Sequence, residues 1–305
     1  MTLQKAVPVA EVRPTGRVKA FVTLFKLRIF TLLWAESVVG LLLASGLSFD
    51  LYRLAALSAA GFLATAGSGA LNNYFDRDID AKMKRTSSRP IPSKRVTPRE
   101  ALTVGIAMGA LGISVALFGL SPLSGVMVAS GYLTYAVVYT YLLKRRTSWN
   151  IVVGGAAGSF AFLAGWAAAA PVGLEASLIA LIVFLWTPSH FWALAIKAVR
   201  QYENAGIPML PVVAGVRATA QAIVANSVAL VACSLLPFAL GYFGYLYLAF
   251  AAVLGFLLLY SDVRLMTTGT PSAAWSAYKF TAPYLLVLSL AMVADRLIFH
   301  AVALL

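Results

Sequence analysis

Long apolar segments, separated by short polar ones, dominate the chain. Nine of them reach the ~20 residues that a helix needs to cross the hydrocarbon core of a membrane. They lie at residues 20–47, 51–75, 100–118, 121–143, 149–169, 173–197, 218–239, 241–261 and 276–302. Only Pro237 and Gly241 divide the run from 218 to 261, so eight spans are an alternative to nine. The pattern predicts an all-α polytopic membrane protein.

Composition supports a membrane protein and indicates its orientation in the membrane. Hydrophobic residues make up 61% of the chain and the mean hydropathy is +0.85, which excludes an ordinary soluble domain. With nine spans, all 24 Lys and Arg except Arg53 and Arg296 fall on the side of the N-terminus. The positive-inside rule then predicts a multi-pass protein of the cell (inner) membrane with a cytoplasmic N-terminus, and no nucleic-acid partner.

The connections predict a single domain. Those on the outer side, such as 119–121, are too short to hold a second one. We therefore expect a cytoplasmic N-terminal tail at 1–19 and one domain at 20–305, with its helices around a central cavity open toward the cytoplasm. The two long inner loops, 76–99 and 198–217, each contain a proline pair, which indicates either two related halves or a chance match.

The polar stretch NNYFDRDID, residues 72–80, lies at the inner end of the second span. On a helix Asn72, Asp76 and Asp80 fall along one stripe, with ~6 Å between neighbours. Mg²⁺ prefers oxygen ligands and is commonly held by one or two carboxylates together with substrate phosphates. The stripe is therefore a candidate Mg²⁺ site, with Asp76 and Asp80 as candidate catalytic residues. The alternative is a solvated helix end whose acids offset nearby bases.

Basic residues cluster on the same side of the membrane. Arginine forks and lysine point charges are common clamps for phosphate oxygens, although each residue alone is ordinary for an inner loop. Together with a candidate Mg²⁺ site they predict a diphosphate ligand, and an apolar interior suits a prenyl diphosphate. Asp78 points away from the stripe and is expected to pair with Arg77, Lys82 or solvent. The basic set comprises Lys26, Arg28, Arg85, Arg89, Lys94, Lys144, Arg145 and Arg146.

Four stretches resemble known motifs. Residues 72–92 resemble the first acidic signature of the UbiA superfamily of intramembrane prenyltransferases. Residues 135–150, 184–196 and 202–215 narrow the resemblance to the haem O synthase (protohaem IX farnesyltransferase) family. The resemblance implies transfer of farnesyl from farnesyl diphosphate to a vinyl group of haem b, with addition of water, giving haem O and diphosphate.

The resemblance also implies roles for particular residues. Mg²⁺ would be held by Asn72, Asp76 and Asp80. Lys144, a further candidate catalytic residue, would contact the diphosphate. The remaining diphosphate contacts would be Arg28, Arg77 and Arg145, with Arg85 and Arg89 as weaker candidates.

The chain departs from the superfamily pattern at the second acidic signature. Haem O synthases usually carry an Asp immediately before the residue that matches Tyr202, and here Gln201 stands there. A possible second metal site could use Gln201 or Glu203, or a single ion could suffice with Lys197 and Arg200 supplying positive charge.

The chain has two histidines, so few residues could contact haem through an imidazole ring. Of the two histidines, His190 lies in a family-like segment and is the candidate haem-binding residue, with a packed core histidine as the alternative, whereas His300 is expected to be interfacial. Tyr135 and Tyr139 are candidates to face an allylic cation, or are core residues. Glu36, within the first span, is either protonated, hydrogen-bonded to another helix, or part of the haem cavity.

Two other functions stay open at this level. The first is a relative of the same superfamily that prenylates a quinone precursor or a lipid. The second is a cation-coupled transporter whose acidic stripe binds the coupling ion, which the neighbouring basic run disfavours. For a haem O synthase, the expected partners are farnesyl diphosphate, haem b, membrane lipid, and haem A synthase or terminal oxidase maturation proteins.

Overall fold

The computed structural model describes residues 16–46, 48 and 50–303, and their side chains as far as residue 298. Within this part of the chain, nine helices are long and apolar enough to cross a membrane. They are Leu27–Ala44, Leu51–Phe75, Pro98–Gly119, Pro122–Leu143, Asn150–Ala167, Leu174–Lys197, Gly215–Ala239, Tyr245–Thr268 and Pro271–Ile298. The predicted all-α polytopic class is confirmed, with nine spans rather than eight.

The elements follow the spans with local interruptions. Unbroken spans are α2 (Leu27–Ala44), α3 (Leu51–Phe75), α5 (Pro98–Gly119), α9 (Leu174–Lys197), α12 (Gly215–Ala239), α13 (Tyr245–Thr268) and α14 (Pro271–Ala303). The fourth span joins α6 (Pro122–Leu133) to the π-helix η1 (Thr134–Leu143), and the fifth joins α7 (Asn150–Gly154) to α8 (Ala156–Ala167). Short helices between spans are α1 (Arg17–Leu24), α4 (Arg77–Lys82), α10 (Val199–Asn204) and α11 (Leu210–Val213).

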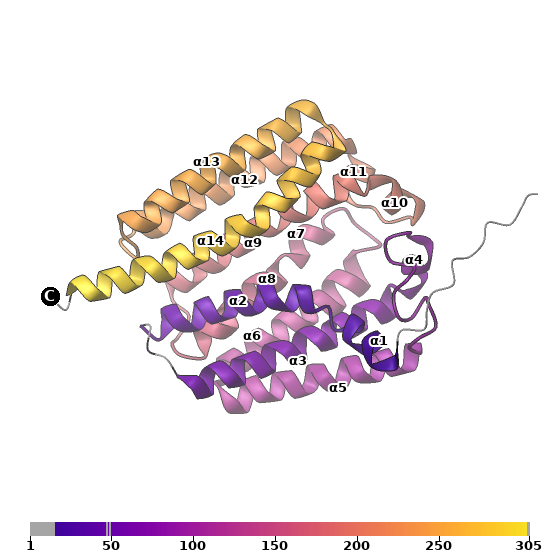
Figure 1. The fold of residues 1–305 in the computed structure, drawn as a ribbon, viewed down its shortest axis with the longest axis horizontal. Helices are drawn as coiled ribbons and strands as arrows, with labels where there is room; N and C mark the ends of the chain where they lie inside the picture. Colours follow the sequence, from indigo (N-terminus) through magenta and orange to yellow (C-terminus); the bar gives the residue numbers. More distant parts are fainter. Residues whose placement is uncertain (1–15, 47, 49, 304–305) are drawn as a thin grey trace, which may run out of the picture.

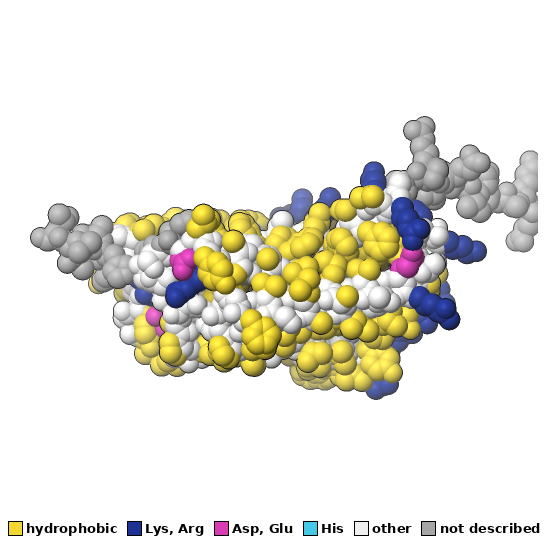
Figure 2. Space-filling view, turned by 90° about the horizontal axis from the view of Figure 1, so that it is seen from below, with side chains coloured by type: hydrophobic (Ala, Val, Ile, Leu, Met, Phe, Trp, Pro, Cys, Tyr) yellow, Lys and Arg dark blue, Asp and Glu magenta, His cyan; other side chains and the backbone are white. Residues whose placement is uncertain are grey.

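The helices form one elongated bundle in which the chain returns repeatedly to the same end (Figure 1). The short helices α1, α4, α10 and α11 all lie at that end. Figure 2 shows Lys and Arg side chains gathered there, with few at the opposite end. The one-sided charge distribution expected from the sequence is therefore present in the folded chain.

Two predicted boundaries need revision. The segment 20–47 is not one helix, because Lys26 adopts a left-handed conformation with φ of 50° and separates α1 from α2. Of the predicted tail at 1–19, residues 1–15 lie outside the described part of the chain, and Arg17 already begins α1. By contrast, the weak division near Pro237 and Gly241 is correct, since α12 ends at Ala239 and Gly241 turns the chain with φ of 76°.

Local signals in the sequence account for several helix starts. Thr97 and Glu100 form a capping box at the start of α5, in which the Thr97 hydroxyl accepts from the Glu100 amide and Glu100 accepts from the Thr97 amide. Pro98 occupies the first helical turn, where its missing N–H costs nothing. Asp50 caps α3 by accepting a hydrogen bond from the Arg53 amide at 3.1 Å.

Close helix packing depends on small residues. At Gly165, in α8, an added Cβ would lie 1.7 Å from the Ser37 carbonyl oxygen of α2. No side chain fits there, so glycine lets the two backbones touch, as is common between membrane helices. Elsewhere the largest apolar cluster fills the space between α2, α8, α9 and α12–α14, with Phe162, Tyr247 and Tyr284 fully buried.

Buried acids outside the polar end serve to connect helices. Glu36 of α2 accepts a hydrogen bond from the Ser289 hydroxyl of α14, which lies 3.1 Å from each carboxyl oxygen. Of the alternatives for Glu36, a hydrogen bond to another helix is thus observed. Asp295 of α14 accepts from the amides of Gly244 and Tyr247 and so caps the start of α13.

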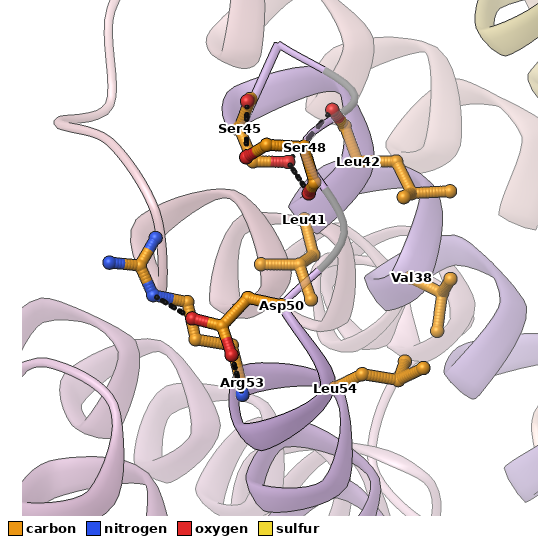
Figure 3. A pocket seen from close by; sticks show the side chains of 8 residues that line it. All are labelled: Val38, Leu41, Leu42, Ser45, Ser48, Asp50, Arg53 and Leu54. Carbon is orange, nitrogen blue, oxygen red and sulfur yellow. Dashed lines mark hydrogen bonds and ion pairs between the residues drawn. The ribbon is translucent and has the colours of Figure 1, made fainter.

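A small cavity of about 130 Å³ lies between the end of α2 and the start of α3 (Figure 3). This connection is at the opposite end of the bundle from α4 (Figure 1). Apolar side chains such as Leu41 and Leu54 line it. Its charged residues, Asp50 and Arg53, form an ion pair with each other at 3.3 Å. The cavity therefore presents no uncompensated charge to a ligand.

Candidate active site at the inner end of the second span

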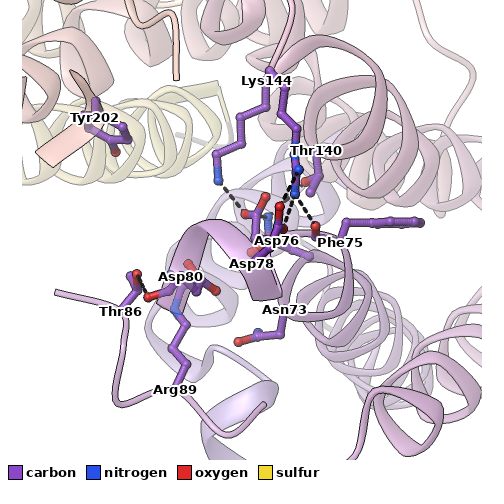
Figure 4. Close-up of polar contacts among 12 residues, drawn as sticks. Asn73, Phe75, Asp76, Asp78, Asp80, Thr86, Arg89, Thr140, Lys144 and Tyr202 are labelled. Carbon is purple, nitrogen blue, oxygen red and sulfur yellow. Dashed lines mark hydrogen bonds and ion pairs between the residues drawn. The ribbon is translucent and has the colours of Figure 1, made fainter. Parts of the chain in front are cut away.

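The acidic stripe lies where α3 gives way to α4. Asp76 ends α3, and the main chain stays hydrogen-bonded across the junction, from the Asp76 amide to the Asn72 carbonyl at 3.0 Å and from the Asp80 amide to the Asp76 carbonyl at 2.8 Å. The spacing of four residues therefore still places Asn72, Asp76 and Asp80 on one side of the helix. Figure 4 shows Asp76 and Asp80 with their neighbours. All three are buried, with exposed fractions of 3%, 0% and 2%.

Asp76 is the most constrained of these groups. Its Oδ2 accepts hydrogen bonds from Lys144, in an ion pair, and from Asn72 Nδ2 at 3.0 Å. Its Oδ1 is buried and has no hydrogen-bond partner among the described residues. A buried carboxylate oxygen without a partner destabilises the folded state, because it has lost its hydrogen bonds to water and has formed none within the protein. An oxygen-binding cation such as Mg²⁺ would satisfy it.

Lys26 reaches the same group from the turn between α1 and α2. Its Nζ donates to Asn72 Oδ1 and to the Tyr135 hydroxyl at 3.1 Å. Burial lowers the pKa of Lys26 well below its ordinary value, and the charge of Arg89 lowers it further, while Asp76 opposes the shift. Gly69 makes this approach possible, because a Cβ there would lie 2.9 Å from the Leu24 carbonyl oxygen.

Asp80 is held by the loop that follows α4. Arg89 donates to Asp80 Oδ2 at 2.7 Å, and the Thr86 hydroxyl donates to the Asp80 carbonyl at 3.2 Å. Arg85, from the same loop, contacts the Tyr202 hydroxyl at 3.4 Å. The first inner loop therefore both neutralises Asp80 and contacts the second inner loop.

The π-helical segment η1 provides the opposite wall. Thr140 accepts from Asn72 Nδ2 at 3.0 Å and donates to the Tyr135 carbonyl at 2.7 Å. The Tyr135 and Tyr139 rings stack with centroids 5.8 Å apart. The Lys144 amide bonds five residues back, to the Tyr139 carbonyl at 2.8 Å. A π-turn of this kind is often found at functional sites, and here it runs from Tyr135 to Lys144 at the acidic group.

Three predicted diphosphate contacts lie beside the stripe rather than on it. Arg28 is exposed, and no described acidic side chain pairs with it. Arg77 donates to the Tyr74 carbonyl at 2.7 Å and lies over the Tyr74 ring. Arg145 donates to Asp78 at 2.8 and 2.6 Å. Their roles toward a diphosphate stay predictions.

The two ion-pair partners predicted for Asp78, Arg77 and Lys82, are wrong, whereas the predicted contact with solvent agrees with its exposed side chain. Both carboxyl oxygens accept from Arg145, which lies far along the chain. This hydrogen-bonded ion pair lowers the pKa of Asp78 and raises that of Arg145. The pair ties η1 to α4, and this joins the two sides of the site.

The possible second site contains one inward-facing group. Gln201, in α10, has a buried Oε1 with no hydrogen-bond partner among the described residues. Glu203, two positions later, is exposed. Gln201 rather than Glu203 therefore has an oxygen in need of a donor or a cation.

His190 lies on α9, seven residues before its inner end, and contacts α14. Its Nδ1 lies 2.6 Å from the Thr281 hydroxyl oxygen, and that hydroxyl donates its single proton to the Tyr278 carbonyl at 2.7 Å. The Nδ1 atom must therefore be the donor, which leaves a lone pair on Nε2. No described residue bonds Nε2. The side chain of His300 lies outside the described residues.

The fold keeps the three predicted metal-binding residues together and buried, and it adds neighbours that the sequence indicates only weakly; their role toward a metal stays a prediction. Lys26 belongs only to the general basic set, although it stands two residues before Arg28. Arg89 is a weaker candidate, and Thr140 carries no signal of its own, since it is a threonine in an apolar span. Among the described residues no three His, Cys, Asp or Glu side chains form a metal cluster, and the predicted stripe contains two carboxylates and one amide.

Comparison with known proteins identifies the family of the chain. Residues 30–288 match the UbiA prenyltransferase family. The chain is 47% identical over 247 residues to Protoheme IX farnesyltransferase 1 of Cenarchaeum symbiosum, which covers 81% of this chain and 83% of that protein.

Solved structures share the fold at low sequence identity. A structure described as giving insights into digeranylgeranylglyceryl phosphate synthase in membranes has a TM-score of 0.78 at 20% identity, and covers 92% of this chain and 99% of its own. A UbiA homolog from Archaeoglobus fulgidus bound to GPP and Mg²⁺ has a TM-score of 0.68 at 16% identity, with 90% and 99% covered. The chain therefore belongs to the UbiA prenyltransferase family and, within it, to the protohaem IX farnesyltransferases.

Proposed function

We propose that this chain transfers the farnesyl group of farnesyl diphosphate to a vinyl group of haem b, with addition of water, and releases haem O and diphosphate. The observation that carries the proposal is the buried Asp76 carboxylate, with one unpartnered oxygen, among three cations that face the stripe: Lys26, Arg89 and Lys144. The description of the relative from Cenarchaeum symbiosum supports haem as the acceptor.

The residues present suit a magnesium ion. The unpartnered Asp76 Oδ1, the Asn72 amide oxygen and the Asp80 carboxylate are the oxygen donors that Mg²⁺ prefers, and these three residues would hold it. When bound, Mg²⁺ supplies positive charge to the diphosphate leaving group. The Mg²⁺ in the solved Archaeoglobus fulgidus homolog supports this choice of metal.

The neighbouring cations bind and orient the diphosphate. Lys144 and Lys26 have flexible ammonium groups that now rest on Asp76 and Asn72, from which they can turn to phosphate oxygens. Arg89 holds Asp80 in place at 2.7 Å. Arg28, Arg77 and Arg145 supply positive charge at the rim. Lys144 thus acts as a catalytic residue together with Asp76 and Asp80, by stabilising the charge that develops on the leaving group.

The allylic cation needs an environment that stabilises it without reacting. The stacked faces of Tyr135 and Tyr139 can do this through their ring quadrupoles. The haem vinyl π bond then attacks the farnesyl carbon, and water adds to the resulting haem-side cation and loses a proton. His190 binds haem through the lone pair on Nε2, and Gln201 supplies a neutral oxygen where relatives with a second acidic signature carry a carboxylate.

The proposed setting is the cell (inner) membrane, with the site and the N-terminus on the cytoplasmic side. Membrane lipid surrounds the spans, and haem A synthase or terminal oxidase maturation proteins take the product. The concentration of Lys and Arg at the site's end supports this orientation (Figure 2).

Purified protein incubated with haem b, farnesyl diphosphate and Mg²⁺ tests the proposal, with products measured by mass spectrometry. Haem O should form, and it should not form when a chelator removes Mg²⁺. A parallel reaction with 4-hydroxybenzoate in place of haem b provides the control for acceptor class. Prenylation of 4-hydroxybenzoate without haem O would overturn the proposal.

A further inference from the structure

A row of aromatic rings runs along the contact between α9 and α14, from the inner end of the bundle into the membrane. The Trp275 and Tyr278 rings stack with centroids 5.2 Å apart, and Tyr278 lies 4.5 Å from the His190 ring. His190 in turn stacks on Trp186, with centroids 4.5 Å apart. The Trp186 Nε1 donates to the Thr281 carbonyl at 2.7 Å, which fixes the deep end of the row.

Two lysines gather at the other end of this row. Lys197 Nζ lies 3.3 Å from the centre of the Trp275 ring, and Lys279 Nζ lies 5.9 Å from the same centre. Neither lysine forms an ion pair or a hydrogen bond with a described residue, and both are exposed; Lys197 ends α9, and Lys279 lies eight residues after the start of α14. Two cations that share one indole, with no carboxylate nearby, form a pair of anion sites on a rigid base.

The spacing relates these cations to His190. Lys197 follows His190 by seven residues, so it lies on nearly the same side of α9 and about 10 Å closer to the inner surface. On α14, which runs antiparallel, Trp275 precedes Thr281 by six residues and lies at the same inner end. A flat ligand bound at His190 Nε2 therefore has two cations beside the edge that points toward the cytoplasm.

We propose that Lys197 and Lys279, held at Trp275, bind the two propionate carboxylates of haem b. The inference rests on the proposed function, because it takes haem b as the acceptor. A haem has its iron at the centre and both carboxylates at one edge, so one orientation satisfies His190 and the lysines together. That orientation keeps the carboxylates at the aqueous surface and directs the opposite edge of the macrocycle into the apolar interior.

The basic groups around the acidic stripe are already engaged. Lys26, Arg89 and Lys144 contact the acidic stripe, and Arg145 is paired with Asp78. The diphosphate and the haem carboxylates therefore draw on different cations, and the two anionic substrates are kept apart.

Absorbance titration of the purified full-length protein tests the inference, with haem b and protohaem dimethyl ester as the two probes. The ester keeps the iron and the macrocycle but lacks the negative charges. The ester lacks both carboxylate charges, so wild-type protein should bind it about 100-fold more weakly than haem b, or about tenfold for each charge-assisted contact. Lys197→Gln removes one of these contacts, so it should weaken haem b binding by about tenfold and leave ester binding and the position of the Soret band unchanged.

Lys197→Arg should retain haem b binding, and Lys19→Gln, an equal charge change on exposed α1, should leave both titrations unchanged. Equal affinity of wild-type protein for haem b and the ester would overturn the inference, as would an equal loss of both ligands in Lys197→Gln. The wild-type comparison needs no variant, so it holds even if a substitution impairs folding. Haem O formation in the same preparation reports on the proposed function separately.

Discussion

Two regions at the same end of the bundle differ in how their charged side chains are paired: the end of α3 and the end of α9. At the end of α3 three cations surround Asn72, Asp76 and Asp80, and the ion pairs lie buried within the protein. At the end of α9 Lys197 lacks an acidic partner among the described residues, and its charge rests on an indole. In the proposed function, the first region exchanges these internal ion pairs for a metal and a diphosphate. The second offers free positive charge and aromatic surface, which suits a flat anionic acceptor.

The largest expected effect comes from the acid at the centre of the first region. Asp76→Asn preserves shape but removes the charge that pairs with Lys144 and that we propose binds Mg²⁺. We expect farnesyl transfer to fall by about 10²- to 10³-fold, the usual cost of removing one preorganised electrostatic contact. Rates of haem O formation measure this. Asp78→Asn, in the same stretch but exposed, is the matched control, and a comparable loss there would contradict the assignment of the stripe.

A second prediction separates Lys26 from Arg28. Lys26 contacts Asn72 and Tyr135 directly, whereas Arg28 is exposed. Lys26→Met should raise the KM for farnesyl diphosphate by about tenfold, since one charge-assisted contact of about 1.4 kcal/mol is lost. Arg28→Met should have a smaller effect. The reverse order would show that Arg28 moves into the site when substrate binds.

Substitutions at Gln201 and Glu203 test whether α10 contributes an oxygen to the site around Asp76. Gln201→Ala removes a buried, unpartnered oxygen, whereas Glu203→Ala changes an exposed side chain. We expect a severalfold drop in kcat for the first and less than about a twofold change for the second, the range typical of altered outer contacts against a neutral surface change. Mg²⁺ dependence of the rate should be measured for both. Equal behaviour of the two would remove Gln201 from the site.

The smallest expected effect concerns the Asp78–Arg145 pair. Its carboxyl is largely exposed, so the pair contributes about 0.5 kcal/mol at most. Because Arg145 lowers the pKa of Asp78 in the folded state, this stability is present above the unfolded pKa and is lost as pH falls through the folded value. Thermal unfolding of wild-type and Asp78→Asn protein between neutral and acid pH should therefore converge at low pH. A difference that grows on acidification would contradict it.

Much of the site was predictable because its spacing is local. Asn72, Asp76 and Asp80 repeat every fourth residue, so helix geometry alone placed them on one side, and their position at the end of an apolar run placed them at the membrane surface. Their partners were not predictable in the same way. Lys144 lies 68 residues from Asp76, and Lys26 lies 46 residues from Asn72, so only packing decides that they meet.

Asp78 shows that residues close in the sequence can also be the wrong partners. Nearby bases in the sequence suggested Arg77 or Lys82, yet Arg77 turns back onto the Tyr74 ring and Arg145 takes the acid. Ion pairs form between side chains that the backbone brings into register, and sequence distance is a poor guide to that. The same holds for His190, whose tautomer is decided by Thr281 on another helix.

The sequence by itself determined an all-α polytopic membrane protein, a one-sided distribution of charge and three oxygen-bearing side chains on one side of a helix, because hydrophobicity and helical period act over neighbouring residues. The tertiary structure alone decided which cation faces which acid. It also placed Lys26 ahead of Arg28 at the stripe, left an oxygen of Gln201 without a partner, and set His190 in a row of aromatic rings. Those outcomes depend on close contact between distant helices, which glycines such as Gly69 and Gly165 permit and which no local pattern encodes.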